Sequence, residues 1–503
     1  GGVVTATIAA GNYATQNALT TSATDVITLT VNAELSVTEF ATLNGKTAGD
    51  ITVGAGVSGT AAQFSDTAGA ATASLTALDA QNTNFSIRTT DATNIAQYDK
   101  MASVVGSGSV TVASIADTAA NCNPSGAIHG LFTANSGIAV ALSDTEITAV
   151  ADINRIKTAT TGDVSATASG TAAVLQGLGA SGGTDTLNLT VTGDAASVTH
   201  AASICDATIG TVSFAAGGLE DTTANLSASN YEALNKVVAK DDDVVITLSD
   251  TTTTLEASVL KTIGGKTDGN VTLSNAHTKI QGTEADLTAA LVTGATKVIL
   301  GGSTATPFEI SSGQTGAVDK VNALAGVTNA GNITGTITST DGTTLAAGMG
   351  NLDTNDVLAV TISGTPTIEQ VNTIAGKTGG VVTATIAAGN YATQNALTTD
   401  ENDVITFTVN AEITVTQFDT LNGKTAGDIT VSGGVTGTAA EFVSTAGVVT
   451  ASLNALDAQN TNFDVTTSDA TNIAQYDAIN GKNGNGSITV GSLADTIDNL
   501  VDS

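Results

Sequence analysis

The chain has 503 residues, and its 47 Asp and Glu against 15 Lys and Arg give a formal net charge of −32. So acidic a surface repels nucleic acid and anionic lipid headgroups, since binding to either depends on cationic side chains. Aromatic residues are 3% of the chain and Trp is absent, which argues against one large globular core and favours a thin core of Ala, Val, Ile and Leu.

Short strands of alternating pattern recur from the start of the chain. In VITLTV (26–31) one face carries Ile27, Leu29 and Val31, while the other carries Val26 and two threonines. Alternation with period two and β-branched residues predicts a half-buried strand. The same pattern predicts further strands at 3–8, 51–53, 85–90, 110–112, 138–142, 164–168, 186–191, 211–215, 244–248, 271–273, 297–300, 333–337, 357–362, 381–386, 404–409, 429–431, 448–453, 463–467 and 488–490.

Short helices are predicted between these strands. In SVTEFATLNGKT (36–47) apolar residues lie at three-residue steps, and Ser36 followed by Glu39 forms a capping-box signature. Other helical patterns lie at 147–156, 231–238, 255–263, 285–291 and 368–374.

The spacing of these elements predicts an α/β solenoid. A short parallel strand plus a short helix or turn would form each coil of about 20–27 residues, within the range of strand-plus-helix repeats. The alternative is a right-handed parallel β-helix, since only NALDAQNTN separates the strands predicted at 448–453 and 463–467. Segments 123–137 and 302–313 are the least regular, and we expect them to be insertions.

A longer period lies over the short one. Residues 1–21 return letter for letter at 379–399, and the copies stay in register without a gap to Asn121 and Asn499. We therefore expect residues 1–503 to form one continuous solenoid, with 1–378 as one super-repeat and 379–503 as the start of the next, a copy of 1–125. Such a chain would be a mature product or a segment of a longer protein.

The triplet Gly-Lys-Thr suggests a phosphate-binding loop. That motif needs a glycine five residues before the Gly-Lys, a position held in the four triplets by Phe40, Leu260, Val371 and Phe418. We instead interpret the triplet as a helix terminator, with the glycine left-handed and the lysine near the negative end of the helix.

Acidic turns are the candidate metal ligands. The clusters Asp241, Asp242, Asp243 and Asp400, Asp403 could offer carboxylate oxygens to Ca2+. They have neither the spacing of an EF-hand nor the nonapeptide of calcium β-rolls, so the alternative is a solvated acidic turn. We expect no other cofactor.

Catalysis has little basis in this sequence, and we expect no enzyme. The histidines His129, His200 and His277 are far apart and belong to no HxxxH or HExxH pattern. The counterpart of Cys122 in the second copy is Leu500, which predicts a buried apolar position instead of a catalytic thiol.

Threonines on the polar faces of neighbouring strands form a further pattern. Regular Thr-x-Thr ladders are similar to those of ice-binding solenoids. The register is broken elsewhere by residues such as Gly54 and Arg88, so we interpret these threonines as good strand formers. The threonines concerned are Thr5, Thr7, Thr28, Thr30, Thr383, Thr385, Thr406 and Thr408.

Several phrases resemble repeats of giant acidic cell-surface and extracellular filament proteins of bacteria, above all of the cyanobacterial type. They include SVTEFATLNGKTAGDITV (36–53), LTALDAQNTN (75–84) and the turns IADTAANC (115–122), LEDTTANL (219–226) and LADTIDNL (493–500). The resemblance implies an extracellular or cell-surface location and a structural role in a surface layer, fibre, adhesin or coat. It implies no catalytic residues.

We therefore expect a structural repeat protein that self-associates by end-to-end stacking of its coils into a filament, fibre or coat. The alternative is an adhesin stalk or binding module for carbohydrate or a cell surface, stiffened by calcium, with divalent cations or surface glycans as partners. We expect no nucleic acid partner, and no membrane insertion because no apolar run approaches the roughly 18 residues of a transmembrane helix.

Overall fold

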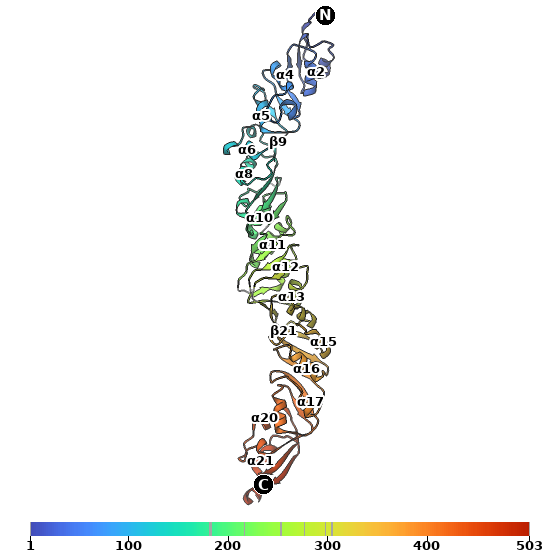
Figure 1. Cartoon of the computed structure of the whole chain (residues 1–503), viewed down its shortest axis with the longest axis vertical. Helices are drawn as coiled ribbons and strands as arrows, with labels where there is room; N and C mark the ends of the chain where they lie inside the picture. Colours follow the sequence, from blue (N-terminus) through green and yellow to red (C-terminus); the bar gives the residue numbers. More distant parts are fainter. Residues whose placement is uncertain are drawn as a thin grey trace. The chain divides into compact units, whose positions relative to one another are not determined.

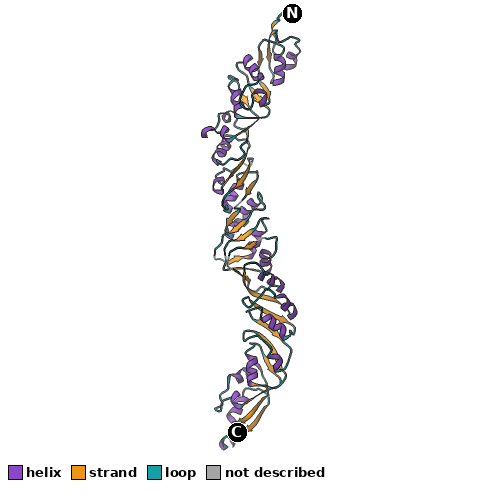
Figure 2. Cartoon of the chain, viewed as in Figure 1, coloured by secondary structure: helices purple, strands orange, loops and turns teal. Residues whose placement is uncertain are grey.

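The structure, a computed structural model, describes residues 2–180, 184–215, 217–251, 254–275, 277–296, 298–302 and 305–501. It is an α/β protein with several parallel sheets and short helices between their strands (Figures 1 and 2). The chain divides into two compact units, Gly1–Ile246 with Thr267–Gly269, and Thr247–Lys266 with Asn270–Ser503.

The strands are two to twelve residues long. They are β1 (Thr5–Thr7), β2 (Val26–Val31), β3 (Leu35–Ser36), β4 (Ile51–Val53), β5 (Val57–Gly59), β6 (Ile87–Thr89), β7 (Ala92–Thr93), β8 (Val110–Thr111), β9 (Ser114–Asp117), β10 (Ala139–Leu142), β11 (Val164–Gly170), β12 (Thr186–Val191), β13 (Val212–Phe214), β14 (Leu219–Asp221), β15 (Ile246–Leu248), β16 (Thr254–Glu256), β17 (Val271–Leu273), β18 (Lys279–Gly282), β19 (Val298–Leu300), β20 (Thr306–Ile310), β21 (Ala330–Asp341), β22 (Val357–Ser363), β23 (Val382–Thr385), β24 (Val404–Val409), β25 (Ile413–Thr414), β26 (Ile429–Val431), β27 (Val435–Gly437), β28 (Val465–Thr471) and β29 (Ile488–Leu493).

The α-helices are short, with four to ten residues each, apart from α11 with 16. They are α1 (Tyr13–Asn17), α2 (Val37–Asn44), α3 (Ala61–Phe64), α4 (Ala73–Gln81), α5 (Ile95–Ala102), α6 (Ala119–Cys122), the 3₁₀ turn η1 (Pro124–Gly126), α7 (Leu131–Ala134), α8 (Val150–Ala159), α9 (Ala172–Leu175), α10 (Val198–Asp206), α11 (Thr223–Val238, broken at 228–231), α12 (Ala257–Gly264), α13 (Glu284–Leu291), α14 (Val318–Ala325), α15 (Gly342–Gly348), α16 (Ile368–Ala375), α17 (Tyr391–Gln394), α18 (Val415–Asn422), α19 (Ala439–Phe442), α20 (Ala451–Gln459), α21 (Ile473–Asn480) and α22 (Ile497–Val501).

Within each sheet, neighbouring strands come from successive repeats of the chain. The first unit holds the sheets β1-β2-β4, β3-β5-β6-β8 and β7-β9-β10-β11-β12-β13, and the second holds β16-β18-β20-β21-β22-β23-β24-β26, β25-β27-β28-β29 and the pair β17-β19. Partners are 21 residues apart in β1–β2 (Thr5 beside Val26) and 30 apart in β27–β28 (Val435 beside Val465). The predicted alternation of strand and helix is confirmed, with a slightly wider repeat than expected.

Alternation along each strand builds the core. In β2, Ile27, Leu29 and Val31 are at most 2% exposed, and Leu29 lies beside Ile51 of β4. The register therefore stacks one aliphatic side chain on the next along the inner face of the sheet.

The predicted cap of α2 is present. Ser36 Oγ accepts a hydrogen bond from Glu39 N at 3.1 Å, and Glu39 Oε2 accepts one from Ser36 N at 2.8 Å. Val37, Phe40 and Leu43 are buried, so the three-residue apolar step faces the core as expected.

Two predictions of secondary structure are wrong. Residues 448–453 are not a strand: α20 begins at Ala451, with Thr450 capping Leu453 N and with Leu453 and Leu456 fully buried. The apolar spacing of this segment has the helical period, and it outweighed the three β-branched residues that suggested a strand. The expected insertion 302–313 contains β20, whose Phe308 pairs with Ile280, although residues 303–304 lie outside the described residues.

Other predictions were incomplete. The sequence missed short second strands such as β3, β5, β25 and β27. They pair in parallel with the predicted strands, in the sheets β3-β5-β6-β8 and β25-β27-β28-β29. They are two or three residues long, too short to show an alternation. Residue 297 of the predicted strand 297–300 lies outside the described residues, and the remainder is β19.

Candidate functional site

A Thr-x-Gly triplet begins four residues before a strand at six places in the described chain. The Thr425 hydroxyl accepts hydrogen bonds from Ile405 N and Gly427 N, both at 2.7 Å, and donates to Ile405 O at 2.9 Å. Ile405 belongs to the preceding repeat, so one buried hydroxyl ties two repeats together. The six threonines are Thr47, Thr160, Thr208, Thr267, Thr378 and Thr425.

The glycine of this triplet is required by close approach of the backbone. A Cβ at Gly427 would lie 2.6 Å from Ile405 O, and one at Gly49 would lie 2.7 Å from the Ile27 carbonyl. Any side chain there would push the two repeats apart. Sequence reasoning missed this six-residue set, although the recurrence of Thr-x-Gly before strands was available to find it.

The lysine of the Gly-Lys-Thr triplet also binds a backbone carbonyl of the preceding repeat. Lys46 Nζ donates to Leu19 O at 2.7 Å, and Lys424 Nζ donates to Leu397 O at 2.6 Å, each in the preceding repeat. The prediction of a left-handed glycine is wrong, because Gly45 has φ −72° and Gly423 has φ −71°. The helix ends in a tight right-handed turn that residues other than glycine also adopt at this place, as Ser103 does after α5.

Aspartates within a strand, or up to two residues after it, cap a helix of the preceding repeat. Asp117 Oδ2 accepts from Ile95 N at 2.7 Å, where Ile95 is the first residue of α5. The first amides of a helix lack an internal partner and carry the positive end of its dipole, so a carboxylate there is favourable. The other members are Asp91, Asp144, Asp221, Asp469 and Asp495, which accept from Ala61, Ala119, Val198, Ala439 and Ile473.

Aspartates just before a strand accept a hydrogen bond from a backbone amide in, or next to, the strand of the preceding repeat. Asp25 Oδ1 accepts from Val4 N at 2.9 Å, and Asp403 Oδ1 accepts from Val382 N at 2.8 Å. Asp185 and Asp356 make the same bond to Val164 and Ile333. Some of the acidic residues of the chain therefore have a structural role, because their carboxylates hold neighbouring repeats together.

The candidate calcium ligands fall into two separate groups. Asp241 to Asp243 precede β15, and Asp241 Oδ2 accepts from Phe214 N at 2.6 Å. Asp400 caps its own turn by accepting from Asn402 N at 2.8 Å, while Asp403 holds Val382. Burial raises the pKa of Asp241 and of Asp403, with their backbone hydrogen bonds opposing the shift.

The described residues contain no group of three or more His, Cys, Asp or Glu side chains arranged to hold a metal ion. The three histidines lie on different elements, and His200 is exposed on α10. His129 Nε2 lies 3.1 Å from Asp99, and His277 is buried elsewhere, in the second unit, where burial lowers its pKa.

Both cysteines are free and buried. Burial raises the pKa of the Cys122 and Cys205 thiols to about 12, so both are protonated near neutral pH. Cys122 is fully buried, as its replacement by Leu500 in the second copy predicted.

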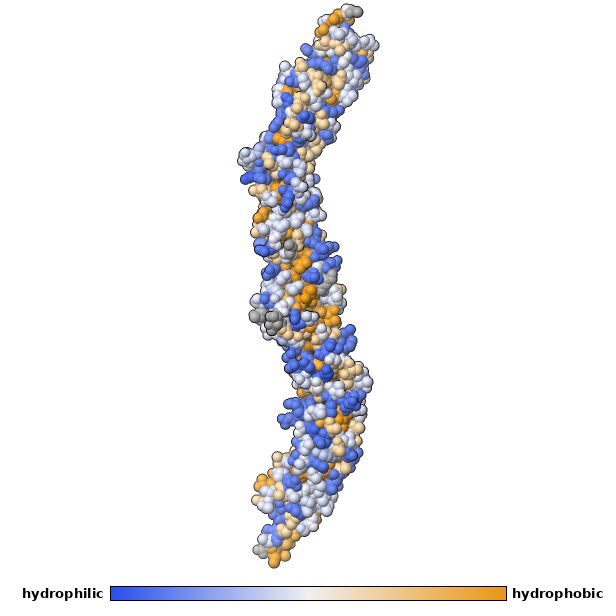
Figure 3. Space-filling view, viewed as in Figure 1, coloured by the Kyte–Doolittle hydropathy of each residue, from blue (hydrophilic) through white to orange (hydrophobic). Residues whose placement is uncertain are grey.

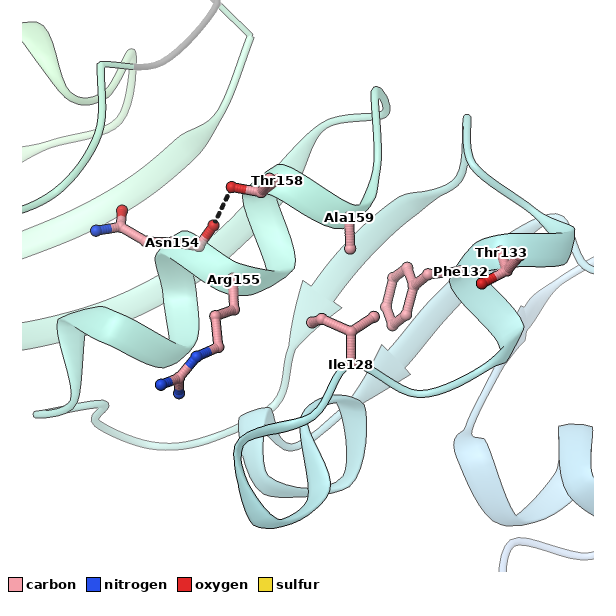
Figure 4. Close-up of a pocket in the computed structure, with 7 residues that line it drawn as sticks. All are labelled: Ile128, Phe132, Thr133, Asn154, Arg155, Thr158 and Ala159. Atoms are coloured by element: carbon pink, nitrogen blue, oxygen red, sulfur yellow. Dashed lines mark hydrogen bonds between the residues drawn. The ribbon is translucent and has the colours of Figure 1, made fainter.

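A surface groove lies between the irregular segment 123–137 and α8 (Figure 4). It measures about 540 Å³, and Ile128, Phe132 and Ala159 form its apolar part. Its polar groups are already engaged: Arg155 Nη1 lies 2.9 Å from Asp152, and Thr158 donates to Asn154 O at 2.8 Å. The groove therefore offers apolar contact and one guanidinium, without a nucleophile and base in hydrogen-bond reach.

The outer face of one sheet carries a continuous threonine column. Thr414, Thr436, Thr466 and Thr489 lie beside one another on β25, β27, β28 and β29. The first copy has Ser36, Ser58, Arg88 and Thr111 at these places, and Arg88 pairs with Glu34 at 2.6 Å. The column is therefore not a common feature of the copies. Figure 3 shows hydrophilic and hydrophobic residues interspersed on the face in view.

No family model, characterised protein or solved structure with which the chain was compared matches it. Among the helices in the described residues, none combines the length and the apolar character needed to cross a bilayer.

Proposed function

We propose that this protein is an extracellular structural repeat protein that builds a cell-surface filament, fibre or coat by end-to-end stacking of its repeats. In this proposal the paired repeats continue as the coils of a solenoid. The observation that carries it is the Thr-x-Gly triplet, which we call the Thr-x-Gly clamp. At six places its threonine hydroxyl bonds to the backbone of the preceding repeat, and its glycine lies close to that backbone.

The distribution of polar side chains supports a mechanical role. Buried aspartates and threonines bind backbone amides of a neighbouring repeat, an arrangement that satisfies them without a ligand. The resemblance to giant surface proteins agrees with this role, and the role needs no cofactor and no catalytic group.

Electron microscopy of the purified protein over a range of concentrations tests the proposal. We expect rods longer than one molecule, whose mean length grows with concentration. Short rods of one length at all concentrations would contradict end-to-end stacking.

The groove beside Phe132 favours one alternative, an adhesin stalk that binds surface glycans, because it combines open apolar surface with the Arg155 guanidinium. Binding on a glycan array that is lost in R155A would support adhesion. A melting temperature raised by Ca2+ and lowered by chelator would support stiffening by calcium at the acidic turns.

A further inference from the structure

In the described parts of the chain, five parallel sheets end at a strand whose free edge is bound by a side chain of the next repeat. Asn460 shows the arrangement in full, because its Oδ1 accepts from Val431 N at 3.0 Å and its Nδ2 donates to Ile429 O at 2.9 Å, both on β26. Ser432 N bonds to Val409 O of β24 at 3.0 Å. Alternate residues of a strand bond to opposite sides, so Ile429 and Val431 face away from β24. Asn460 therefore binds the groups that a further strand would pair with.

Four other side chains make the same kind of contact. Each belongs to an Asn or Asp that lies one to four residues after a helix, and each bonds to the last strand of a sheet. The contacts are Asn82 Oδ1 with Val53 N at 3.2 Å on β4, Asn135 Nδ2 with Val110 O at 3.4 Å on β8, Asp241 Oδ2 with Phe214 N at 2.6 Å on β13, and Asn329 Nδ2 with Leu300 O at 2.9 Å on β19.

Helices that are followed by a Thr-x-Gly clamp are associated with the opposite outcome. Thr425 follows α18 and binds Ile405, and the next strand, β26, pairs with β24. Asn460 follows α20 and binds β26, and the next strand, β28, pairs with β27 of another sheet. The residue type after the helix therefore marks whether a sheet continues or ends. The sheet also continues after Thr47, Thr160, Thr208 and Thr378, and it also ends after Asn82, Asn135 and Asn329.

We propose that Asn82, Asn135, Asp241, Asn329 and Asn460 are edge caps. Each takes the place of the next strand, ends its sheet inside the chain, and keeps the last strand from pairing with a strand of another molecule. The unpaired N–H and C=O groups of an edge strand are a template for such pairing. The inference goes beyond end-to-end stacking of repeats and does not depend on it.

The edge of β19 borders an open apolar groove. β17 occupies one side of β19, and on the other side Asn329 Nδ2 binds Leu300 O. Ile299 is 48% exposed and Val292 is 39% exposed, and both line a groove of about 340 Å³ beside this edge. Asn329 is itself exposed. This edge cap therefore stands between the strand and a partner in solution.

The partner held back at β19 is the same edge of a second copy. With a net charge of −32, two copies repel one another over most of their surface. None of the described residues that line the groove is charged, so two copies can approach closely there. Two identical edges pair as an isologous contact, which closes as a dimer.

The conformation of Asn329 allows the cap to be removed without strain. Its φ is 62°, in the left-handed region that glycine adopts freely. We expect N329G to keep the fold and to free Leu300 O. N230G is the matched control, because Asn230 is also left-handed (φ 58°) and exposed but lies in the break of α11, outside any strand.

Sedimentation velocity of the full chain measures association, with far-UV circular dichroism to check folding. We expect N329G to approach about twice the weight-average mass of wild type at the same high concentration, while N230G keeps the wild-type mass. N329G/I299K should return to the wild-type mass, because a lysine on an edge strand opposes strand pairing. The comparison is with wild type throughout, so it holds whether or not wild-type chains stack end to end.

The edge cap of β26 gives an independent readout. Asn460 is 6% exposed, so its loss frees a covered edge, and we expect N460A to keep the wild-type mass. Amide hydrogen exchange of β26 should instead become faster, because Val431 N loses its acceptor. N454A is the control, since Asn454 is exposed on the same helix.

The inference is overturned if N329G keeps the wild-type mass at every concentration, or if N230G or N329G/I299K associates as strongly as N329G. Exchange of β26 that is unchanged in N460A, or equally fast in N454A, would also contradict it.

Discussion

Single hydroxyl groups join repeats in this protein. The Thr47 and Thr425 side chains are 3% exposed, and each hydroxyl contacts two backbone groups of the preceding strand. The next strand begins four residues after the threonine and does not reach this part of the preceding strand. The buried hydroxyl therefore makes the hydrogen bonds that a paired strand would make there. The Gly-Lys-Thr triplet, whose sequence suggests a nucleotide-binding loop, therefore supplies a threonine that joins neighbouring repeats.

The first prediction is that T425V destabilises the protein. Valine keeps the shape but leaves Ile405 N and Gly427 N without a partner, which costs roughly 1–3 kcal/mol. Urea unfolding followed by circular dichroism measures the change. T420V is the control, because Thr420 is exposed and its hydroxyl bonds only within its own helix; an equal loss in both variants would contradict the clamp.

A second prediction concerns the stability that Asp464 contributes and its loss at low pH. Backbone and side-chain hydrogen bonds from Ser487 hold the pKa of Asp464 below its usual value, so its stabilising contribution is present above the unfolded pKa and is lost as pH falls through the folded one. The first copy has Ser86 at this position, which accepts from Ser109 N at 3.2 Å. We expect D464S to be less stable than wild type near pH 6 and the difference to shrink below about pH 4.

The urea midpoints of wild type and D464S at several pH values test this. A difference that stays constant, or grows, as the solution is acidified would show that ionised Asp464 contributes nothing.

At the scale of elements, the spacing between repeats depends on a few glycines. Gly423 and Gly427 stand four residues apart in LNGKTAGD, yet their surroundings differ: a Cβ at Gly423 would be 3.7 Å from the nearest atom, and one at Gly427 only 2.6 Å from Ile405 O. Two glycines of one phrase thus have unrelated roles, and only the neighbouring repeat distinguishes them.

We expect G427A to lose about 1–3 kcal/mol by forcing the strands apart. G423A should be neutral or stabilise by about 0.4–1 kcal/mol, because its right-handed φ suits alanine and the unfolded chain loses entropy. Thermal and urea unfolding of the two variants, measured side by side, decide this; similar losses in both would mean that backbone approach is not the cause.

At the scale of the whole molecule, contacts run between adjacent repeats, and the two compact units each contain one copy of the duplicated segment. Thr47 lies in the first unit and Thr425 in the second, with the same bonds in both. Stability in such arrays is set by each repeat and its nearest neighbours, so damage should remain local.

We therefore expect T47V to raise amide hydrogen exchange around β2 and β4 but not around β24 and β26, and T425V to do the reverse. Hydrogen exchange with mass-spectrometric readout measures both variants against wild type. Faster exchange in both copies from a single substitution would indicate one cooperative core instead.

The sequence alone determined the alternation of short strands and helices, the capping box of α2, the burial of Cys122 and the duplication at Gly379, because each depends on local spacing or on identity of letters. Only the tertiary structure decided what the acidic turns and the Thr-x-Gly triplets do, since their partners lie 20 to 30 residues away in a neighbouring repeat. It also distinguished α20 from a strand and Gly427 from Gly423. A hydrogen bond or a close approach between repeats depends on register, and register is fixed only when the strands pair.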